Sequence, residues 1–262
     1  MDSFVSSVGF EKTFRYIKLI EQGLLVTVML AACTVVIGFV LGIILALIRM
    51  SDIRPLRFLA YDRQGRLRNS KTLIAISKIN PISFFAAAYV EILRSTPVLV
   101  QIMIIYHGVF GKLIDLPNFT LFGFLKFNRF IPGVVALGMN SGAYLCEIIR
   151  SGIQSIDGGQ AEAARSLGMN KTQTLSNIIL PQAIKNILPA IANEFVTIIK
   201  ESSICWTIGA VEIMAAVQSV TAATYRAGEP LIVAACLYFC LTFPTSKIIE
   251  HFERKMSRGD KR

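Results

Sequence analysis

The sequence predicts an all-α integral membrane protein with about five transmembrane helices, on the evidence of its composition, its apolar runs and its placement of basic residues. Hydrophobic residues fill 53% of the 262 positions and charged residues only 17%, and the mean hydropathy is +0.57. Soluble domains usually carry about 25% charged residues. We therefore expect the apolar residues to face lipid rather than one core shielded from water.

Five apolar runs are long enough to cross a hydrocarbon layer of about 30 Å, which takes about 20 helical residues. They cover residues 23–48, 82–109, 131–149, 187–209 and 231–249. The first run carries no charge and would extend about 39 Å as a helix. It is too long for the core of a cleavable signal and is followed by basic residues, so we expect it to stay in the protein as a spanning helix.

A pair of small residues, Gly38 and Gly42, lies within the first run. Small residues four positions apart can let a second helix approach closely. Because the pattern is also common by chance, a specific packing role and no role remain equally open.

The basic residues gather in two segments. They are Arg49, Arg54, Arg57, Arg63, Arg66, Arg68, Lys71 and Lys78 in the first, and Lys247, Arg254, Lys255, Arg258, Lys261 and Arg262 in the second. Cytoplasmic segments carry an excess of Lys and Arg, so both segments are predicted to be cytoplasmic. Five spans then place the N-terminus outside and the C-terminus in the cytoplasm.

The same orientation puts the connections 112–130 and 210–230 outside and the connection 150–186 inside. Three basic residues near the N-terminus, Lys12, Arg15 and Lys18, count against an external N-terminus. The N-terminal segment could alternatively be an amphipathic helix that lies on the membrane.

Several function classes find no support. The net charge of +10 is spread between apolar runs and not along a nucleic-acid reading element. No phosphate-binding loop or HExxH motif occurs, and the histidines are only His107 and His251. The cysteines are odd in number and lie within apolar runs, so we interpret them as packing residues rather than disulfide or metal ligands. We expect no catalytic residue, no metal and no cofactor bound by this chain.

The connection after the third run has a sequence pattern that predicts regular secondary structure rather than an irregular loop. Residues 158–167 favour a short helix, and Gly168 can take the left-handed conformation that ends one. Asn170 followed by Gln173 fits a capping box, which predicts that a second helix begins there.

Small side chains at Ala161 and Ala164 would give the first short helix a surface of low relief. Such a helix suits insertion into a groove of a partner protein. An ordinary helical hairpin packed on its own bundle explains the composition equally well.

The spacing of one motif separates these alternatives. Glu162-Ala163-Ala164 is followed at fixed intervals by Gly168, Ile178 and Leu180-Pro181. This pattern resembles the EAA loop of ATP-binding-cassette (ABC) importer permeases. Further segments narrow the resemblance to the polar amino acid uptake branch. They read AYVEILRSTPVLVQ from Ala88, SGAYLCEIIRSGIQSI from Ser141, GQAEAARSLG from Gly159, LPQAIKNILPAIANEF from Leu180 and IIKESSICWTIGAVE from Ile198.

The resemblance implies a permease subunit of an ATP-driven importer in a bacterial inner membrane. It implies a second permease subunit, two ABC ATPase subunits that hold ATP and Mg, and an extracytoplasmic solute-binding protein that delivers the amino acid. The residues it assigns to ATPase coupling are Gln160, Glu162, Ala163, Ala164, Gly168, Ile178, Leu180 and Pro181.

The implied domain organisation is an N-terminal segment (1–22), a transmembrane permease domain (23–249) and a basic cytoplasmic tail (250–262). The coupling loop covers about 150–186. The basic insertion at about 50–80 departs from the family pattern, in which the first two spans are joined by a short connection. It could contact anionic lipid or the ATPase, or be a plain cytoplasmic hairpin.

Polar residues within spans are costly unless they face a partner or water. We take Gln101, Asn140, Glu147 and Glu194 as tentative pathway residues. Glu194 and Glu201 lie two helical turns apart and share one face, which could line the pathway or a subunit contact. Local pairing is the alternative, for example Glu147 with Arg150 or Glu91 with Arg94.

The second run contains Arg94-Ser95-Thr96-Pro97, where proline should break or bend the helix. The serious functional alternative to an ABC permease is a secondary transporter or channel for a small polar solute that works alone. The sequence leaves open which amino acid is carried and whether the permeases pair as a homodimer or a heterodimer.

Overall fold

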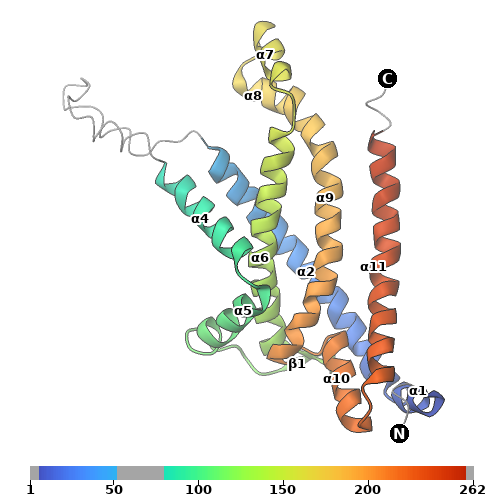
Figure 1. The fold of residues 1–262 in the computed structure, drawn as a ribbon. Coiled ribbons are helices and arrows are strands. Elements are labelled where there is room, and N and C mark those ends of the chain that lie inside the picture. Colours follow the sequence, from blue (N-terminus) through green and yellow to red (C-terminus); the bar gives the residue numbers. More distant parts are fainter. Residues whose placement is uncertain (1–5, 52–79, 258–262) are drawn as a thin grey trace.

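The computed structural model describes residues 6–51 and 80–257, which form a helical bundle with one short hairpin (Figure 1). The first half contains α1 (Ser7–Phe14), α2 (Ile17–Met50), α4 (Pro81–Ser95), α5 (Val98–Met103), the π-helix η2 (Ile104–Val109), β1 (Thr120–Leu121) and β2 (Leu125–Lys126). The second half contains α6 (Phe127–Gln154), α7 (Gly158–Ser166), α8 (Lys171–Thr174), the π-helix η3 (Leu175–Ile179), α9 (Leu180–Glu201), the 3-10 helix η4 (Ser202–Ile208), α10 (Ile213–Thr224) and α11 (Gly228–Ser257).

All five predicted runs fall on helices, but they do so in different ways. Within the described residues, α2 and α11 are each long and apolar enough to span a membrane. Two bent pairs qualify only as units: α4 with α5 and η2, bent by 111°, and the helix that ends in η4 with α10, bent by 49°. The remaining run belongs to α6, which packs against both α2 and α9. A helix that faces other helices can be less apolar than one that faces lipid.

Glycines let α2 and α6 pack closely. A Cβ atom at Gly38 would lie 2.8 Å from the hydroxyl oxygen of Ser141, and one at Gly42 would lie 2.7 Å from the Cβ of Leu145. Real Cβ atoms do not come this near, so both positions require glycine. Of the two alternatives left open for this glycine pair, the structure supports the packing role, and the partner helix is α6.

Glu212 holds α10 and α11 together although its carboxylate is fully buried. It caps the N-terminus of α10 by accepting hydrogen bonds from the amides of Met214 (2.8 Å) and Ala215 (2.7 Å), and it accepts a third from the hydroxyl of Tyr238 on α11 (2.7 Å). The amide of Ile213 donates to the hydroxyl of Thr27 on α2. The start of α10 is thereby fixed to two neighbouring helices.

A second buried carboxylate, Glu229, ties the N-terminal residues to the start of α11. It accepts from the amide of Ser6 at 2.8 Å and pairs with Arg226 at 2.7 Å. Gly9 packs so closely on it that a Cβ atom there would meet the carboxylate at 1.9 Å. Since α2 begins at Ile17, the spanning helix starts earlier than the boundary expected after residue 22.

Two predicted connections contain structure that the sequence interpretation did not include. The segment 210–230 holds α10, and the segment 112–130 holds the β1–β2 hairpin and the first residues of α6. The end expected for the fourth run at Gly209 is confirmed, since that residue takes the left-handed conformation with φ of 80°.

The two ends of the bundle carry different elements. One end carries α7, α8, the last turn of α2, the first turn of α4 and the last turn of α11, while α1, α5, β1 and α10 lie at the other (Figure 1). Arg49 and Arg254 therefore share the end that carries α7 and α8. The basic insertion at 52–79, on which one prediction falls, lies outside the described residues.

Candidate functional site

The connection between α6 and α9 is a compact helical hairpin at one end of the bundle. The carboxylate of Asp157 caps α7 by accepting from the amide of Gly159 at 2.7 Å. The chain leaves α7 through Gly168, whose φ is +85°. Asn170 and Gln173 then form both hydrogen bonds of a capping box, each at 2.9 Å. The two predicted short helices, the glycine turn and the second helix start are confirmed.

The exposed face of α7 differs from the face predicted from its alanines. Ala164 is only 4% exposed, and the helix that carries it, α7, packs against η3. Ala164 therefore supports the hairpin and does not belong to its outer surface. The outer surface contains Gln160, Glu162 and Ala163, and the sequence interpretation missed its largest apolar member, Leu167, which is 85% exposed.

The remaining residues of the EAA pattern lie at the junction with α9. Here the helix widens into the π-helix η3, which ends at Ile179, and Leu180 and Pro181 then begin α9. Proline has no amide hydrogen to donate, and the side chain of Gln182 donates to the carbonyl of Ile178 at 2.8 Å. Single-turn π-helices are frequent at functional sites, and this one joins the hairpin to a long membrane helix.

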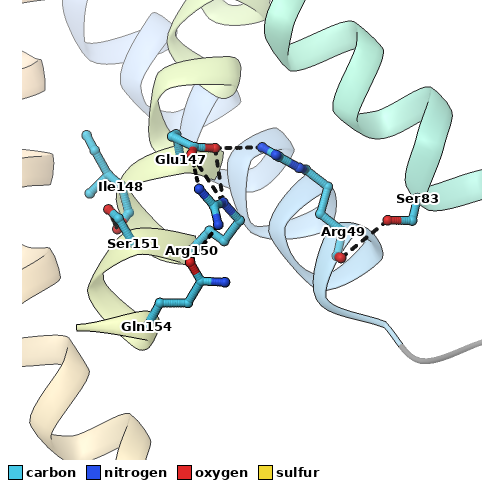
Figure 2. A network of polar contacts seen from close by, with 7 residues as sticks. All are labelled: Arg49, Ser83, Glu147, Ile148, Arg150, Ser151 and Gln154. Atoms are coloured by element: carbon cyan, nitrogen blue, oxygen red, sulfur yellow. Dashed lines mark hydrogen bonds and ion pairs between the residues drawn. The ribbon is translucent and has the colours of Figure 1, made fainter. Parts of the chain in front are cut away.

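A cluster of charges joins three helices near the same end (Figure 2). Glu147 on α6 accepts from Arg49 at the end of α2 at 2.6 Å and also pairs with Arg150. Arg150 donates further to Gln154 at 2.6 Å. The hydroxyl of Ser83 on α4 donates to the carbonyl of Arg49. The predicted pairing of Glu147 with Arg150 is confirmed, whereas Arg49 was not identified as a partner.

Gln101 lies at the sharp bend between α4 and α5. Its side-chain nitrogen donates to the carbonyls of Leu93 (2.7 Å) and Thr96 (3.0 Å), which the break at Pro97 leaves without their usual helical partners. The bend of 111° confirms the interruption predicted at this proline. A cavity of about 240 Å³ lies beside Gln101 and is lined mainly by apolar side chains, among them Ile104.

The four tentative pathway residues do not form one compact site. Gln101 lies at the bend, Glu147 in the charge cluster, Asn140 is buried on α6, and Glu194 is half-buried on α9. No ion pair within the described residues joins Glu91 to Arg94. Arg94 lies instead over the ring of Tyr144, 5.5 Å from its centroid.

The structure thus defines the chain as a bundle of membrane helices with an exposed two-helix hairpin at one end. Comparison with known families identifies the family of this chain. The chain belongs to the family described as binding-protein-dependent transport system inner membrane component, whose sequence profile matches residues 73–258.

Curated relatives cover nearly the whole chain. The arginine transport system permease protein ArtQ of Bacillus subtilis (strain 168) is 36% identical over 254 residues, which cover 97% of this chain and 100% of ArtQ. The putative glutamine transport system permease protein GlnP of Rickettsia conorii is 36% identical over 245 residues, which cover 94% of this chain and 96% of GlnP.

Solved structures agree with this fold. A crystal structure of an amino acid ABC transporter with histidines matches with a TM-score of 0.77 and 38% identity, covering 94% of this chain and 98% of that one. The MetNI methionine ABC transporter matches with a TM-score of 0.61 at 17% identity, covering 90% of this chain and 97% of that one. The second match concerns the fold alone. The chain is thus an ABC importer permease, a multi-pass inner-membrane protein and not an enzyme.

Proposed function

We propose that this chain is the membrane-spanning subunit of an ATP-driven importer of polar amino acids. The observation that carries the proposal is the hairpin with the complete EAA pattern, set on a bundle that shares 36% identity with a permease named for arginine. Other relatives are named for glutamine and nopaline. These three solutes have in common an amino-acid group and a polar side chain that contains nitrogen.

The coupling role is assigned to the exposed part of the hairpin. Gln160, Glu162, Ala163 and Gly168 are exposed, and Leu167 is 85% exposed. A short helix with small neighbours and one projecting apolar side chain suits a groove of a partner. The other four residues support this exposed part. The junction between the hairpin and α9 contains Ile178, Leu180 and Pro181, and Ala164 is buried on α7.

The partners that follow are two ATPase subunits beneath the hairpins, a second permease subunit and a solute-binding protein at the opposite end. ATP and Mg would be held by the ATPase subunits. Closing of the ATPase pair would move α7 as a rigid body, and α9 would pass that movement to the spans.

The proposed orientation places α7, α8 and the C-terminus in the cytoplasm and the N-terminus outside. It is supported by the shared position of Arg49 and Arg254 at the hairpin end, as the positive-inside rule requires. An epitope at the C-terminus should bind antibody only after the cells are permeabilised, whereas one at the N-terminus should bind antibody on intact spheroplasts.

Among the tentative pathway residues, Glu194 is the first to test. Glu147 already pairs with two arginines, and the side-chain nitrogen of Gln101 is used at the bend. No ion pair among the described residues engages Glu194, whose carboxyl group lies near Ser141 of α6. A carboxylate suits the amino group of a zwitterionic or cationic solute.

The proposal is tested by purifying the tagged chain from its native membrane and identifying what comes with it. An ABC ATPase is expected, and cells without the chain should lose uptake of at least one labelled polar amino acid. If the chain purifies without an ATPase and moves solute alone, it is a secondary transporter or channel, and the proposal is wrong.

A further inference from the structure

The connection between η2 and α6 leaves the helix bundle but remains apolar. From Lys112 to Lys126 it reads KLIDLPNFTLFGFLK, in which Asp115 is the third charged residue. Five large apolar side chains in it are exposed: Leu113 by 79%, Ile114 by 47%, Phe119 by 43%, Leu121 by 37% and Phe122 by 74%. An exposed apolar group of this extent marks a surface that contacts a membrane or another protein.

The tip of the connection is a tight hairpin with an unusual turn residue. Leu121 is paired with Leu125, and the amide of Phe124 donates to the carbonyl of Leu121 at 3.2 Å. The turn residues Phe122 and Gly123 have φ of 55° and 79°. Glycine adopts such values readily, whereas bulky residues rarely do. The turn therefore holds a phenyl ring at a position where asparagine or glycine is usual.

The base of the hairpin is firmly attached to the bundle. Leu125 is 2% exposed and belongs to the core between α2 and α6. The rings of Phe119 and Phe127 stack with their centroids 4.7 Å apart, and the amide of Phe127 donates to the carbonyl of Phe119 at 3.1 Å. The exposed apolar residues are thus presented on a formed element.

The β1–β2 hairpin lies at the end of the bundle opposite α7 and α8 (Figure 1). The 111° bend between α4 and α5 precedes it, and α6 follows it directly. The same end exposes other aromatic side chains, Trp206 by 44% and Tyr225 by 95%. Trp and Tyr are enriched where a membrane meets water, and lysines can keep their charge in water while their stems lie along apolar groups.

We propose that residues 112–126 form an interfacial anchor, whose apolar side chains enter the lipid leaflet at the end opposite the coupling hairpin. Lipid is favoured over a soluble partner because the segment joins two membrane helices and its only charged residues are Lys112, Asp115 and Lys126. A surface for a soluble protein would carry a polar rim around its apolar centre. The anchor fixes the chain between the bent span and α6 at the membrane surface.

The test uses a single indole as a reporter of its surroundings. Trp206→Phe removes the only tryptophan, and Phe122→Trp or Leu113→Trp then adds one to the segment. The full chain is reconstituted in phosphatidylcholine vesicles with and without brominated acyl chains. We expect brominated lipid to lower the emission of both reporters about twofold, since interfacial residues lie only about 5–10 Å deep, while aqueous acrylamide quenches them weakly.

Leu167→Trp in the same background is the matched control, because Leu167 is similarly exposed but lies on the coupling hairpin. Its indole should respond to acrylamide and not to brominated lipid. The proposal is overturned if the reporters at Phe122 and Leu113 behave like this control. It is also overturned if they become shielded from acrylamide only when a soluble solute-binding protein is added, because the segment would then be a docking surface.

Discussion

Arg49 and Glu147 stand 98 positions apart in the sequence, and their side chains meet at 2.6 Å between the end of α2 and α6. Each side chain is only 20% exposed, and Arg150 approaches the same carboxylate. One acidic group therefore balances two guanidinium groups next to the hairpin end of the bundle.

Glu147→Gln should destabilise the protein because it leaves two arginines without their anion. Removing one partner of such a contact costs on the order of 1–3 kcal/mol, so the thermal midpoint in detergent should fall. Glu11→Gln is the control, since the pair of Glu11 and Arg15 is 69% and 71% exposed and should contribute less than about 1 kcal/mol. Equal midpoints for both variants would show that the cluster has no structural role.

Glu212→Ala should destabilise the junction of α10 and α11, because it removes the acceptor for two amides and for the hydroxyl of Tyr238. We expect a loss of roughly 1–3 kcal/mol. Tyr238→Phe should cost less, and the double variant should cost less than the sum of the two. Strict additivity in this double-mutant cycle would mean that the two side chains do not interact.

Gly168→Val should impair coupling without disturbing membrane insertion. A Cβ atom there meets nothing within 4 Å, so the penalty comes from the φ of +85° and is about 1–2 kcal/mol. Ligand-stimulated ATPase activity should separate from uptake in proteoliposomes. Gly158→Ala is the control, because Gly158 also has open space around it but no positive φ. Unchanged coupling in Gly168→Val would count against the role of the turn.

Leu167→Ser should weaken association with the ATPase while leaving folding intact, since the side chain is 85% exposed and has little packing to lose. The measurement is the amount of ATPase that co-purifies with the tagged chain. Leu113→Ser changes a side chain of similar exposure at the opposite end and should leave that amount unchanged. Equal recovery of ATPase from both variants would remove Leu167 from the interface.

Glu194→Gln should lower the rate of amino acid uptake several-fold, because it removes the charge that a solute amino group would meet. Binding of the ATPase should persist, which separates an effect on the pathway from an effect on assembly. An uptake rate equal to that of the unaltered chain would exclude Glu194 from the pathway.

Much of the fold could be predicted from the sequence because its signals are local. Long apolar runs predicted the positions of the membrane helices, and Gly168, Asn170 and Gln173 determine the coupling hairpin through backbone conformation and capping. The break at Pro97 follows from the geometry of proline itself. In each case neighbouring residues carry the physical cause.

Other features depend on contacts between distant residues and could not be predicted in this way. The burial of Ala164 depends on where η3 lies, and alanine alone does not indicate which side of a helix faces the bundle. In the sequence Glu212 lies in a connection between apolar runs, and nothing local indicates that it accepts a hydrogen bond from Tyr238 on α11. In the sequence Arg49 is one of many basic residues, and its pairing with Glu147 depends on how α2 packs against α6. For the candidate site, the hairpin was therefore predicted well and its outward face was not.

The central claim is that the hairpin couples this bundle to a separate ATPase. The direct test is uptake of labelled arginine or glutamine into proteoliposomes that contain the chain, its co-purified ATPase and its solute-binding protein, with and without ATP. Accumulation against a gradient should require ATP and all components. Downhill movement of the same solute by the chain alone, unaffected by ATP or by the ATPase, would contradict the claim.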